Sequence, residues 1–455
     1  MKRTALTIAV DEALRAAGRP GPGETLVAAL SGGADSVALL DVLAQLAVRR
    51  GFGLVAAHLD HGLRASSKAD AAFCRDLCRR LGVSLEVGTA DVRARAREEK
   101  GGLEEAARLE RYAFLREVED KHGAVGIAVA HTLDDQAETF LLRLLRGAGT
   151  AGLGAMRPVS GDILRPMLEA TRRDVLAHLE SRGLEHREDE TNADLSFPRN
   201  RVRRELLPYL EQRFNPKVRQ ALARAASVLS EEAGVLAEEG AALLSAAGPG
   251  ERDGDDIVVD RTALASVGRA LGRAAVRAAL EQTGGLRDIG LDHVDRVLAL
   301  CSSPRASGKR LPLPGGRQAV VEFDYLRVGP RREPAVPFSV ELVVPGEAEI
   351  PGGFSIEALS DAGPAEANGV TAVVSAPEDG PLTVRTRRPG DRVRARGRDM
   401  SLKKFLMERR VPADERGRLP LLARGRRVLW VPGQPVDADA AGGRYVRVRL
   451  RRKKT

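Results

Sequence analysis

The segment Leu26–Ser36, LVAALSGGADS, constrains the fold of this chain more than any other stretch. An apolar run enters a short loop of small and polar residues, and a second apolar run, Val37–Leu40, follows directly. This order predicts a buried strand that turns into a helix through a loop able to hold phosphate. Glycine permits positive φ and close backbone approach, and a helix N-terminus favours negative charge.

The loop carries the groups that a phosphate would need. Backbone N–H groups and two hydroxyls can donate to it, and the carboxylate of Asp35 could hold Mg²⁺ beside it. The phosphate-binding candidates are Ser31, Gly32, Gly33, Ala34, Asp35 and Ser36. A Walker A loop is excluded because the loop has no lysine and no G-x-x-x-x-G-K-[ST] spacing. A glycine-rich turn without a ligand is the alternative for this segment taken alone.

Apolar runs and helical stretches alternate through the first third of the chain. The expected elements are strands at Leu26–Leu30, Leu54–Leu59, Val83–Val87 and Val125–Ala130, and helices at Ser36–Arg50, Ser67–Leu81, Leu103–Lys121 and Asp134–Arg146. Such alternation predicts an α/β fold with a doubly wound, mostly parallel sheet. Ligands of these sheets bind at the carboxyl ends of the strands, where the loops after the first, second and fourth strands would lie.

The remaining sequence is too long to share one core with this sheet, so we expect further domains. Composition and pattern divide the 455 residues into four parts. They are an α/β domain at 1–215, a mostly helical middle domain at 216–330, a linker with short strands at 331–381 and a small basic α+β domain at 382–455.

Charge is segregated along the chain. Residues 385–455 hold 23 basic and 7 acidic side chains, a net +16, although the whole chain carries only +9 and residues 1–384 carry −7. A basic terminal module predicts a polyanionic partner. General solubility in an arginine-rich chain is the alternative, and it explains scattered arginines better than it explains this segregation.

Cysteine usage and hydropathy exclude several classes. The three cysteines, Cys74, Cys78 and Cys301, form no C-x-x-C pair, which argues against a disulfide framework, an iron–sulfur site and a zinc ribbon. The N-terminus lacks the pattern of a signal peptide, and no apolar run approaches the roughly 20 residues of a membrane span. We therefore expect a cytoplasmic protein without a membrane partner.

Three further segments belong with the glycine loop. They are HLDHGLR after the second expected strand, HTLDDQAET after the fourth, and the basic helix start FPRNRVR (Phe197–Arg203). Asp135 and Glu138 lie three residues apart and so share a helix face, where they could join Asp35 around Mg²⁺ and a cationic substrate. Taken singly, His58 and His131 can be strand caps, Asp134 a helix cap and the arginines a solvated face. Four segments at one sheet edge favour a site.

Taken together, the motifs resemble a known family. SGGADS matches the pyrophosphate loop of the N-type ATP pyrophosphatases. Further motifs look like tRNA(Ile)-lysidine synthetase: HLDHGLR, ARLERY (Ala107–Tyr112), HTLDDQAET, RGAGTAGLGAM (Arg146–Met156), the D-x-T-N-x-D…F-x-R-N-x-x-R run (Asp189–Arg203) and Arg387–Leu422. The resemblance covers most of residues 20–215 and 382–432. Thr132 departs from it, because many members carry a second histidine there.

The resemblance implies a two-step ligation. The 2-carbonyl oxygen of the wobble cytidine of CAU-anticodon isoleucine tRNA attacks the α-phosphate of ATP. Free L-lysine then displaces AMP, which yields lysidine. ATP would lie on Ser31–Ser36 with His58 and Asp60 at the nucleotide end of the site. Mg²⁺ would take Asp35 and Asp135 as ligands, Arg111 and Arg203 would stabilise developing negative charge, and Asp135 and Glu138 would orient the lysine.

The RNA would be held at two places. Arg199 is expected to contact it near the catalytic edge, and basic residues of the terminal module would grip phosphates elsewhere without specifying sequence. The terminal candidates are Arg387, Arg388, Arg392, Lys403 and Lys404. A homodimer is compatible with the resemblance. A tRNA 2-thiolation enzyme of the same superfamily is the alternative, although such enzymes need cysteines for sulfur delivery.

Overall fold

The computed structural model describes residues 4–60, 67–98, 102–187, 194–248, 256–361, 371–376, 382–434, 436–437 and 444–452. The chain divides into two compact units, Met1–Leu236 and Ala237–Thr455, with the boundary inside one long helix. Each unit is described by itself below.

The first unit is built on a six-stranded sheet with the order β3-β2-β1-β4-β6-β5. All neighbouring pairs are parallel except β5 with β6. The strands are β1 (Thr25–Ala29), β2 (Gly53–Asp60), β3 (Ser84–Thr89), β4 (Ile127–Ala128), β5 (Val159–Ser160) and β6 (Ile163–Leu164). This confirms the expected α/β class with a mostly parallel sheet.

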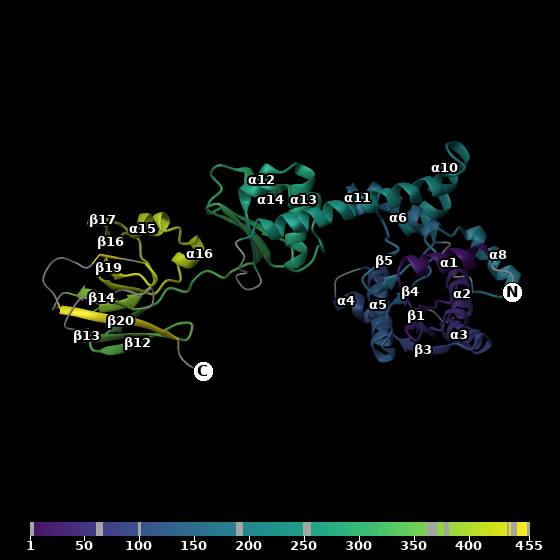
Figure 1. Ribbon diagram of the computed structural model, residues 1–455, viewed down its shortest axis with the longest axis horizontal. Coiled ribbons are helices and arrows are strands. Elements are labelled where there is room, and N and C mark those ends of the chain that lie inside the picture. Colours follow the sequence, from purple (N-terminus) through teal and green to yellow (C-terminus); the bar gives the residue numbers. More distant parts are fainter. Residues whose placement is uncertain are drawn as a thin grey trace. The chain divides into compact units, whose positions relative to one another are not determined.

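Helices cover both faces of this sheet (Figure 1). The covering helices are α1 (Ala5–Ala16), α2 (Ala34–Arg50), α3 (Ser67–Leu81), α4 (Val92–Glu98), α5 (Leu103–His122) and α8 (Arg172–Arg182). Alternate residues of β1 serve the two faces: Leu26 and Ala28 pack with α1, α2, α3 and α8, whereas Val27 packs with α5. A strand buried on both sides must be apolar at every position, which is why LVAA reads as a continuous apolar run.

The polar edge of the sheet is completed by shorter helices. These are α6 (Leu133–Leu145), α7 (Thr150–Leu153), α9 (Pro198–Arg201), the π-helix η2 (Val202–Leu206), α10 (Leu207–Arg213) and the start of α11 (Val218–Ala246). The basic segment FPRNRVR caps and forms α9 and begins η2. Val202 of η2 and Leu207 of α10 share a small core with Ala137 and Leu141 of α6.

The second unit begins with a helical layer on a small antiparallel sheet. The helices are α12 (Arg261–Ser266), α13 (Arg269–Gln282) and α14 (Leu291–Ser302), and the sheet has the order β7-β10-β9-β8. Its strands are β7 (Ile257–Asp260), β8 (Arg310–Leu313), β9 (Arg317–Glu322) and β10 (Tyr325–Pro330). The middle region is therefore more sheet-rich than the mostly helical domain expected for 216–330.

The terminal region contains two more sheets, β11-β15-β18-β19-β16-β17 and β12-β13-β20-β14. Their strands are β11 (Ser339–Leu342), β12 (Gly346–Ile350), β13 (Phe354–Asp361), β14 (Thr371–Ala376), β15 (Leu382–Arg385), β16 (Arg392–Ala395), β17 (Arg398–Ser401), β18 (Leu421–Arg424), β19 (Arg427–Trp430) and β20 (Arg444–Arg452). Two short helices, α15 (Leu402–Glu408) and α16 (Ala413–Arg416), lie between β17 and β18 in the chain.

The expected linker at 331–381 needs correction. It contains the short strands that were expected, but β11 pairs with β15, and both β13 and β14 pair with β20. Residues Ile356, Val374, Val446 and Val448 share one buried core. The segment is thus part of the same folded body as the basic residues that follow it.

Across the described part of the chain, no helix combines the length and apolarity that crossing a bilayer would require.

Candidate active site

The glycine loop joins β1 to α2 in the conformation that its sequence predicts. Gly32 has φ +87°, in the left-handed region that glycine adopts without strain. Gly33 caps α2 with extended backbone. The hydroxyl of Ser36 donates to the carbonyl of Gly33 at 2.9 Å and accepts from the N–H of Ser31 at 3.2 Å, which closes the loop on the first turn of the helix.

The loop lies where the strand order reverses. The chain passes from β1 to β2 on one side of β1, whereas β4 pairs with β1 on the other side. The carboxyl ends of β1 and β4 therefore form the switch point at which open α/β sheets bind ligands. The helices α2 and α6, which follow these two strands, both begin at this point.

Two carboxylates of α6 receive two arginines from the α9–η2 segment. Glu138 has 0% side-chain exposure and accepts from Nε of Arg199 at 2.9 Å and from Nε of Arg203 at 2.5 Å. Asp135 accepts from the same two guanidinium groups at 2.9 and 3.2 Å. We call Asp135, Glu138, Arg199 and Arg203 the carboxylate–arginine cluster. Its two carboxylate side chains are largely shielded from solvent.

Asp135 also starts the helix that carries it. Its second oxygen accepts from the N–H and the hydroxyl of Thr132 at 2.9 and 3.0 Å, in a capping box. Burial alone would raise the pKa of Asp135, but Arg199 and Arg203 outweigh it and the pKa is lowered. Asp135 is therefore an anion held in place from both sides. The cap is Thr132, so the reading of Asp134 as a helix cap was wrong.

Asp35 and Asp134 are joined through the first residue of α8. Nη1 of Arg172 donates to Asp35 at 2.7 Å, and the N–H of Arg172 donates to Asp134 at 3.1 Å. Removal from bulk water raises the pKa of Asp35, and the charge of Asp135 adds to this, whereas Arg172 and Arg203 oppose it. The charges of Asp35, Asp135 and Arg203 thus act on one another across one site.

His131 and Arg111 complete the basic side of the site. Burial, reinforced by Arg165, Arg199 and Arg111, lowers the pKa of His131 to about 4, although Asp135 opposes the shift. Nδ1 of His131 is buried and has no hydrogen-bond partner among the described residues. Arg111 is exposed on α5, and its pKa is lowered chiefly by partial loss of water, with the charges of Arg108 and Arg199 adding to the shift.

His58 and Asp60 end β2 beside the loop. Nδ1 of His58 lies 2.9 Å from the carbonyl oxygen of Leu30, so Nδ1 carries the proton and ties β2 to the start of the loop. The His58 side chain is buried, and its Nε2 has no partner among the described residues. His58 thus supports the start of the loop through its hydrogen bond to Leu30. Asp60 is half-buried at the end of β2.

The structure brings together most of the residues that the sequence singled out. Asp35, Asp135, Glu138 and Arg203 meet at the switch point, with Arg111 close enough for its charge to act on His131. Arg199, expected to face RNA, turns its guanidinium to the α6 carboxylates instead. Residues 61–64 of HLDHGLR and 189–193 of the asparagine-containing motif lie outside the described residues.

Sequence reasoning missed Arg172 as a member of the site. Its partner Asp35 is 137 residues away, and no local pattern distinguishes Arg172 from the adjacent Arg173. The only local signal is position, because Thr171 and Asp174 form a capping box that makes Arg172 the first residue of a helix.

The terminal candidates lie on the surface of the second unit. Arg387, Arg388, Arg392, Lys403 and Lys404 are all exposed. Arg385, by contrast, is fully buried and donates two 2.8 Å bonds to Asp391, which also accepts from the N–H of Arg388 at 2.7 Å. This buried pair fixes the turn that presents Arg387 and Arg388.

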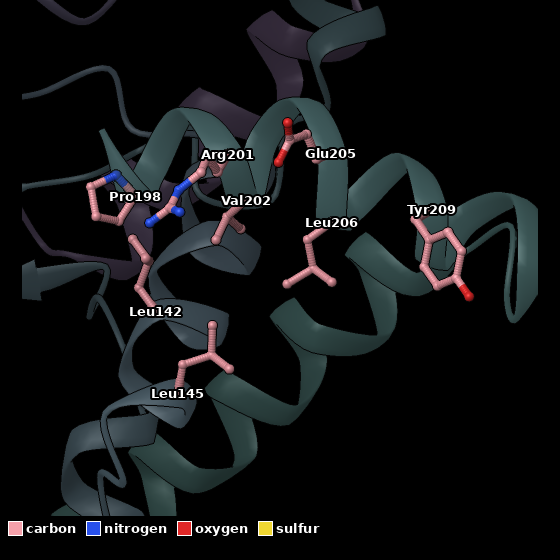
Figure 2. A pocket seen from close by; sticks show the side chains of 8 residues that line it. All are labelled: Leu142, Leu145, Pro198, Arg201, Val202, Glu205, Leu206 and Tyr209. Carbon is pink, nitrogen blue, oxygen red and sulfur yellow. The ribbon is translucent and has the colours of Figure 1, made fainter. Parts of the chain in front are cut away.

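A separate hollow of about 510 Å³ lies between α6 and the α9–α10 segment (Figure 2). Leu142 and Leu145 from α6 face Val202 and Leu206, with Tyr209 at one end. Arg199 and Arg203 are not among the residues that line it. Its lining is mainly apolar and contains none of the candidate catalytic groups, so the hollow is not the site described above.

Comparison with known proteins agrees with this geometry. A family model described as a PP-loop domain matches residues 6–210, and one described as the TilS substrate C-terminal domain matches residues 382–450. The tRNA(Ile)-lysidine synthase of Symbiobacterium thermophilum is 39% identical, with 95% of each chain covered. The enzyme of the same name from Geobacter sulfurreducens is 38% identical, also with 95% of each chain covered. This chain belongs to the tRNA(Ile)-lysidine synthase family.

Proposed function

We propose that this chain is a ligase that uses ATP to join free L-lysine to C2 of the wobble cytidine in CAU-anticodon isoleucine tRNA. The products are lysidine, AMP and pyrophosphate. The observation that carries the proposal is the meeting of a phosphate loop with a carboxylate–arginine cluster at the β1/β4 switch point, in a chain of this family.

The triphosphate would lie on Ser31–Ser36, where loop N–H groups and the N-terminus of α2 favour an anion. Two carboxylates fit a magnesium ion that keeps water and phosphate as its other ligands, which is the usual mode of Mg²⁺ beside nucleotides. We assign this role to Asp35 and Asp135, because the charge of Asp135 raises the pKa of Asp35, as expected of two carboxylates that share one site. Bound there, Mg²⁺ would offset the phosphate charge. Among the described residues no three or more His, Cys, Asp or Glu side chains are grouped as a metal site, and the proposal takes phosphate and water as the remaining ligands.

In the first step, the cytosine 2-carbonyl oxygen forms a bond to the α-phosphorus and the bond to pyrophosphate breaks. Negative charge grows on the phosphoryl oxygens and on the leaving group. Preformed cations lower this barrier because they need no reorganisation. We assign this role to Arg111 and Arg203, of which Arg203 is fixed by Glu138.

In the second step, the lysine ε-amine attacks C2, and AMP leaves with the oxygen that it acquired in the first step. The amine must arrive without its extra proton or lose it on the way. Asp135 and Glu138 are the proposed acceptors and anchors. Because Arg199 and Arg203 occupy both carboxylates, the proposal requires one arginine to yield an oxygen when lysine enters.

The terminal module would hold the tRNA backbone through Arg387, Arg388, Arg392, Lys403 and Lys404. Phosphate contacts position a nucleic acid without reading its sequence. We propose that Arg199 meets the anticodon loop only if it leaves Glu138, so its RNA contact and its ion pair are alternatives.

The proposal is tested by incubating the full chain with ATP, radiolabelled lysine and CAU-anticodon isoleucine tRNA, and by following label in the RNA. Incorporation that depends on ATP supports it. Label absent from this tRNA, or equal in a methionine tRNA with the same anticodon, would contradict the proposed substrate.

The 2-thiolation alternative finds no support in the cysteines. All three are buried, and burial raises the pKa of Cys74 to about 12 and those of Cys78 and Cys301 to about 11. Thiols in such surroundings are poor nucleophiles and poor sulfur carriers. A homodimer and a cytoplasmic location stay predictions from the sequence.

A further inference from the structure

Arg172 lies at the junction of three helix N-termini. Asp35 stands in the first turn of α2, Asp134 in the first turn of α6, and Arg172 is the first residue of α8. The side chain of Arg172 reaches Asp35 at 2.7 Å while its N–H donates to Asp134 at 3.1 Å. The N-terminal turns of α2, α6 and α8, where backbone N–H groups favour negative charge, are thus linked through Arg172.

The ion pair between Arg172 and Asp35 is not needed to pack α8 on α2. Deeper in the same interface, Asp41 of α2 is 1% exposed and accepts from Nε2 of His178 at 2.9 Å and from Nε of Arg182 at 3.0 Å. That buried network already locks the two helices. The Arg172 and Asp35 side chains, in contrast, are 48% and 36% exposed. An ion pair this exposed contributes little to stability and is easily exchanged for another partner.

Exchange is what the proposed chemistry demands of Asp35. Its carboxylate cannot hold both the guanidinium and a magnesium ion at full strength, because the two cations would repel each other at short range. A guanidinium released at this position would stand beside the glycine loop. Its planar fork suits phosphate oxygens, which it can contact with two parallel hydrogen bonds.

We propose that Arg172 is a phosphate-binding residue of the ATP site, directed at the pyrophosphate end of the nucleotide. In the free chain it neutralises Asp35, and on nucleotide binding it moves from Asp35 to the β- and γ-phosphates. The inference rests on the proposed function, because it assumes that ATP lies on the glycine loop. Arg172 would give the site a positive charge that belongs to the protein and is not carried away by a substrate. This charge would hold the pyrophosphate while the cytidine is adenylated.

The test measures binding rather than turnover. The full-length chain and its R172Q, R172K and R173Q variants are titrated with Mg-ATP, with Mg-pyrophosphate and with AMP by calorimetry, without lysine or tRNA. Arg173 is the matched control, since it is exposed, adjacent and of the same charge. Melting temperatures of all four proteins show whether any variant loses its fold.

We expect R172Q to raise the Kd of Mg-ATP and of Mg-pyrophosphate about 10- to 100-fold, the effect of losing a charge-assisted contact to phosphate. AMP binding should change little, R172K should recover part of the affinity, and R173Q should match the wild type. Unchanged or tighter Mg-ATP binding by R172Q would overturn the inference, since Arg172 would then only compete for Asp35. An equal loss for AMP would also overturn it. Failure of the wild-type chain to bind Mg-ATP would instead sink the proposed function, and this inference with it.

Discussion

Glu138 has more partners than its sequence position reveals. The spacing of Asp135 and Glu138 predicted a shared helix face, and the structure places both carboxylates at the expected edge. What spacing could not predict is that Arg199 and Arg203, 61 and 65 residues away, would saturate the Glu138 carboxylate. Long-range ion pairs leave no periodic trace in a sequence, so the partners of a catalytic carboxylate emerge only in three dimensions.

Replacing Glu138 with glutamine should separate the two substrates. The amide keeps the shape but leaves two arginines without their anion, which we expect to cost about 2–3 kcal/mol of unfolding free energy, because both arginines keep some contact with water. The KM for lysine should rise about tenfold or more, while the Kd of Mg-ATP stays near its wild-type value. Steady-state kinetics and urea unfolding measure these effects. E211Q, which breaks the ion pair between Glu211 of α10 and Arg219 of α11, is the control, and comparable losses for lysine and ATP would reject the assignment.

His131 should make the stability of the first unit depend on pH. Its pKa of about 4 in the folded chain lies below the ordinary 6.5, so the unfolded chain binds the extra proton first. Stability from this group is therefore complete above pH 6.5 and is lost as the pH falls toward 4, by at most about 3 kcal/mol. Urea unfolding of the wild type and of H131Q at pH 7, 6 and 5 measures the difference. A gap between the two proteins that does not change with pH would contradict the prediction.

At the scale of elements, the turn between β1 and α2 offers two adjacent glycines with different duties. Gly32 has φ +87°, whereas Gly33 has extended backbone that any residue adopts. A Cβ on either would meet neighbours only at ordinary distances of 3.5 Å or more. Gly32→Ala should therefore cost about 1–2 kcal/mol through backbone strain alone and weaken Mg-ATP binding, while Gly33→Ala is nearly neutral for stability. Chemical denaturation and nucleotide titration test the pair, and equal effects of the two substitutions would refute the argument.

Parallel strands and their helices could be predicted because each is a continuous apolar or amphipathic run. The strands of residues 339–376 could be predicted only as short and isolated. β13 and β14 pair with β20, which follows them in the chain after more than 60 residues. No local sequence pattern indicates a partner strand at that distance. Their segment is rich in proline and glycine, so its composition resembles that of a connection. Composition predicted a linker with short strands at the place where strand pairing creates a core.

The turn at 386–391 shows how a buried pair can serve an exposed function. Asp391→Asn would leave the fully buried guanidinium of Arg385 without its anion and would weaken the bond to the N–H of Arg388. We expect a loss of about 3–5 kcal/mol in the stability of the terminal body. Affinity for tRNA should fall with it, and Mg-ATP binding should not. Lys309→Gln is the control, because it removes an exposed charge that belongs neither to a core nor to the proposed tRNA-binding residues. If the Asp391→Asn chain is as stable as the wild type but binds tRNA more weakly, the expected loss of stability is contradicted. The buried pair would then serve only to fix the conformation of the turn.

At the scale of the whole molecule, the distribution of net charge separates the proposed RNA-binding part from the rest of the chain more clearly than any single contact does. The net +16 of residues 385–455 stands against −7 for the rest, and the five terminal candidates are exposed on the second unit. A polyanion drawn to the basic module would leave the acidic part free to admit a cationic amino acid. This segregation of charge could be predicted from the sequence, because the net charge of a segment can be counted without knowing the fold.

Salt dependence should reveal this division. Each phosphate contact releases counterions, so log K for tRNA should fall with log salt, and the slope should shrink by roughly 0.7–0.9 for every contact removed. A quadruple variant, R387Q/R388Q/K403Q/K404Q, should thus bind tRNA more weakly at low salt and lose about three from the slope, with Mg-ATP binding unchanged. The matched control neutralises four exposed arginines outside the module, namely Arg79, Arg80, Arg296 and Arg305. Because that control changes the net charge by the same amount, an equal loss of slope in both proteins would mean that tRNA responds to total charge and not to the terminal surface.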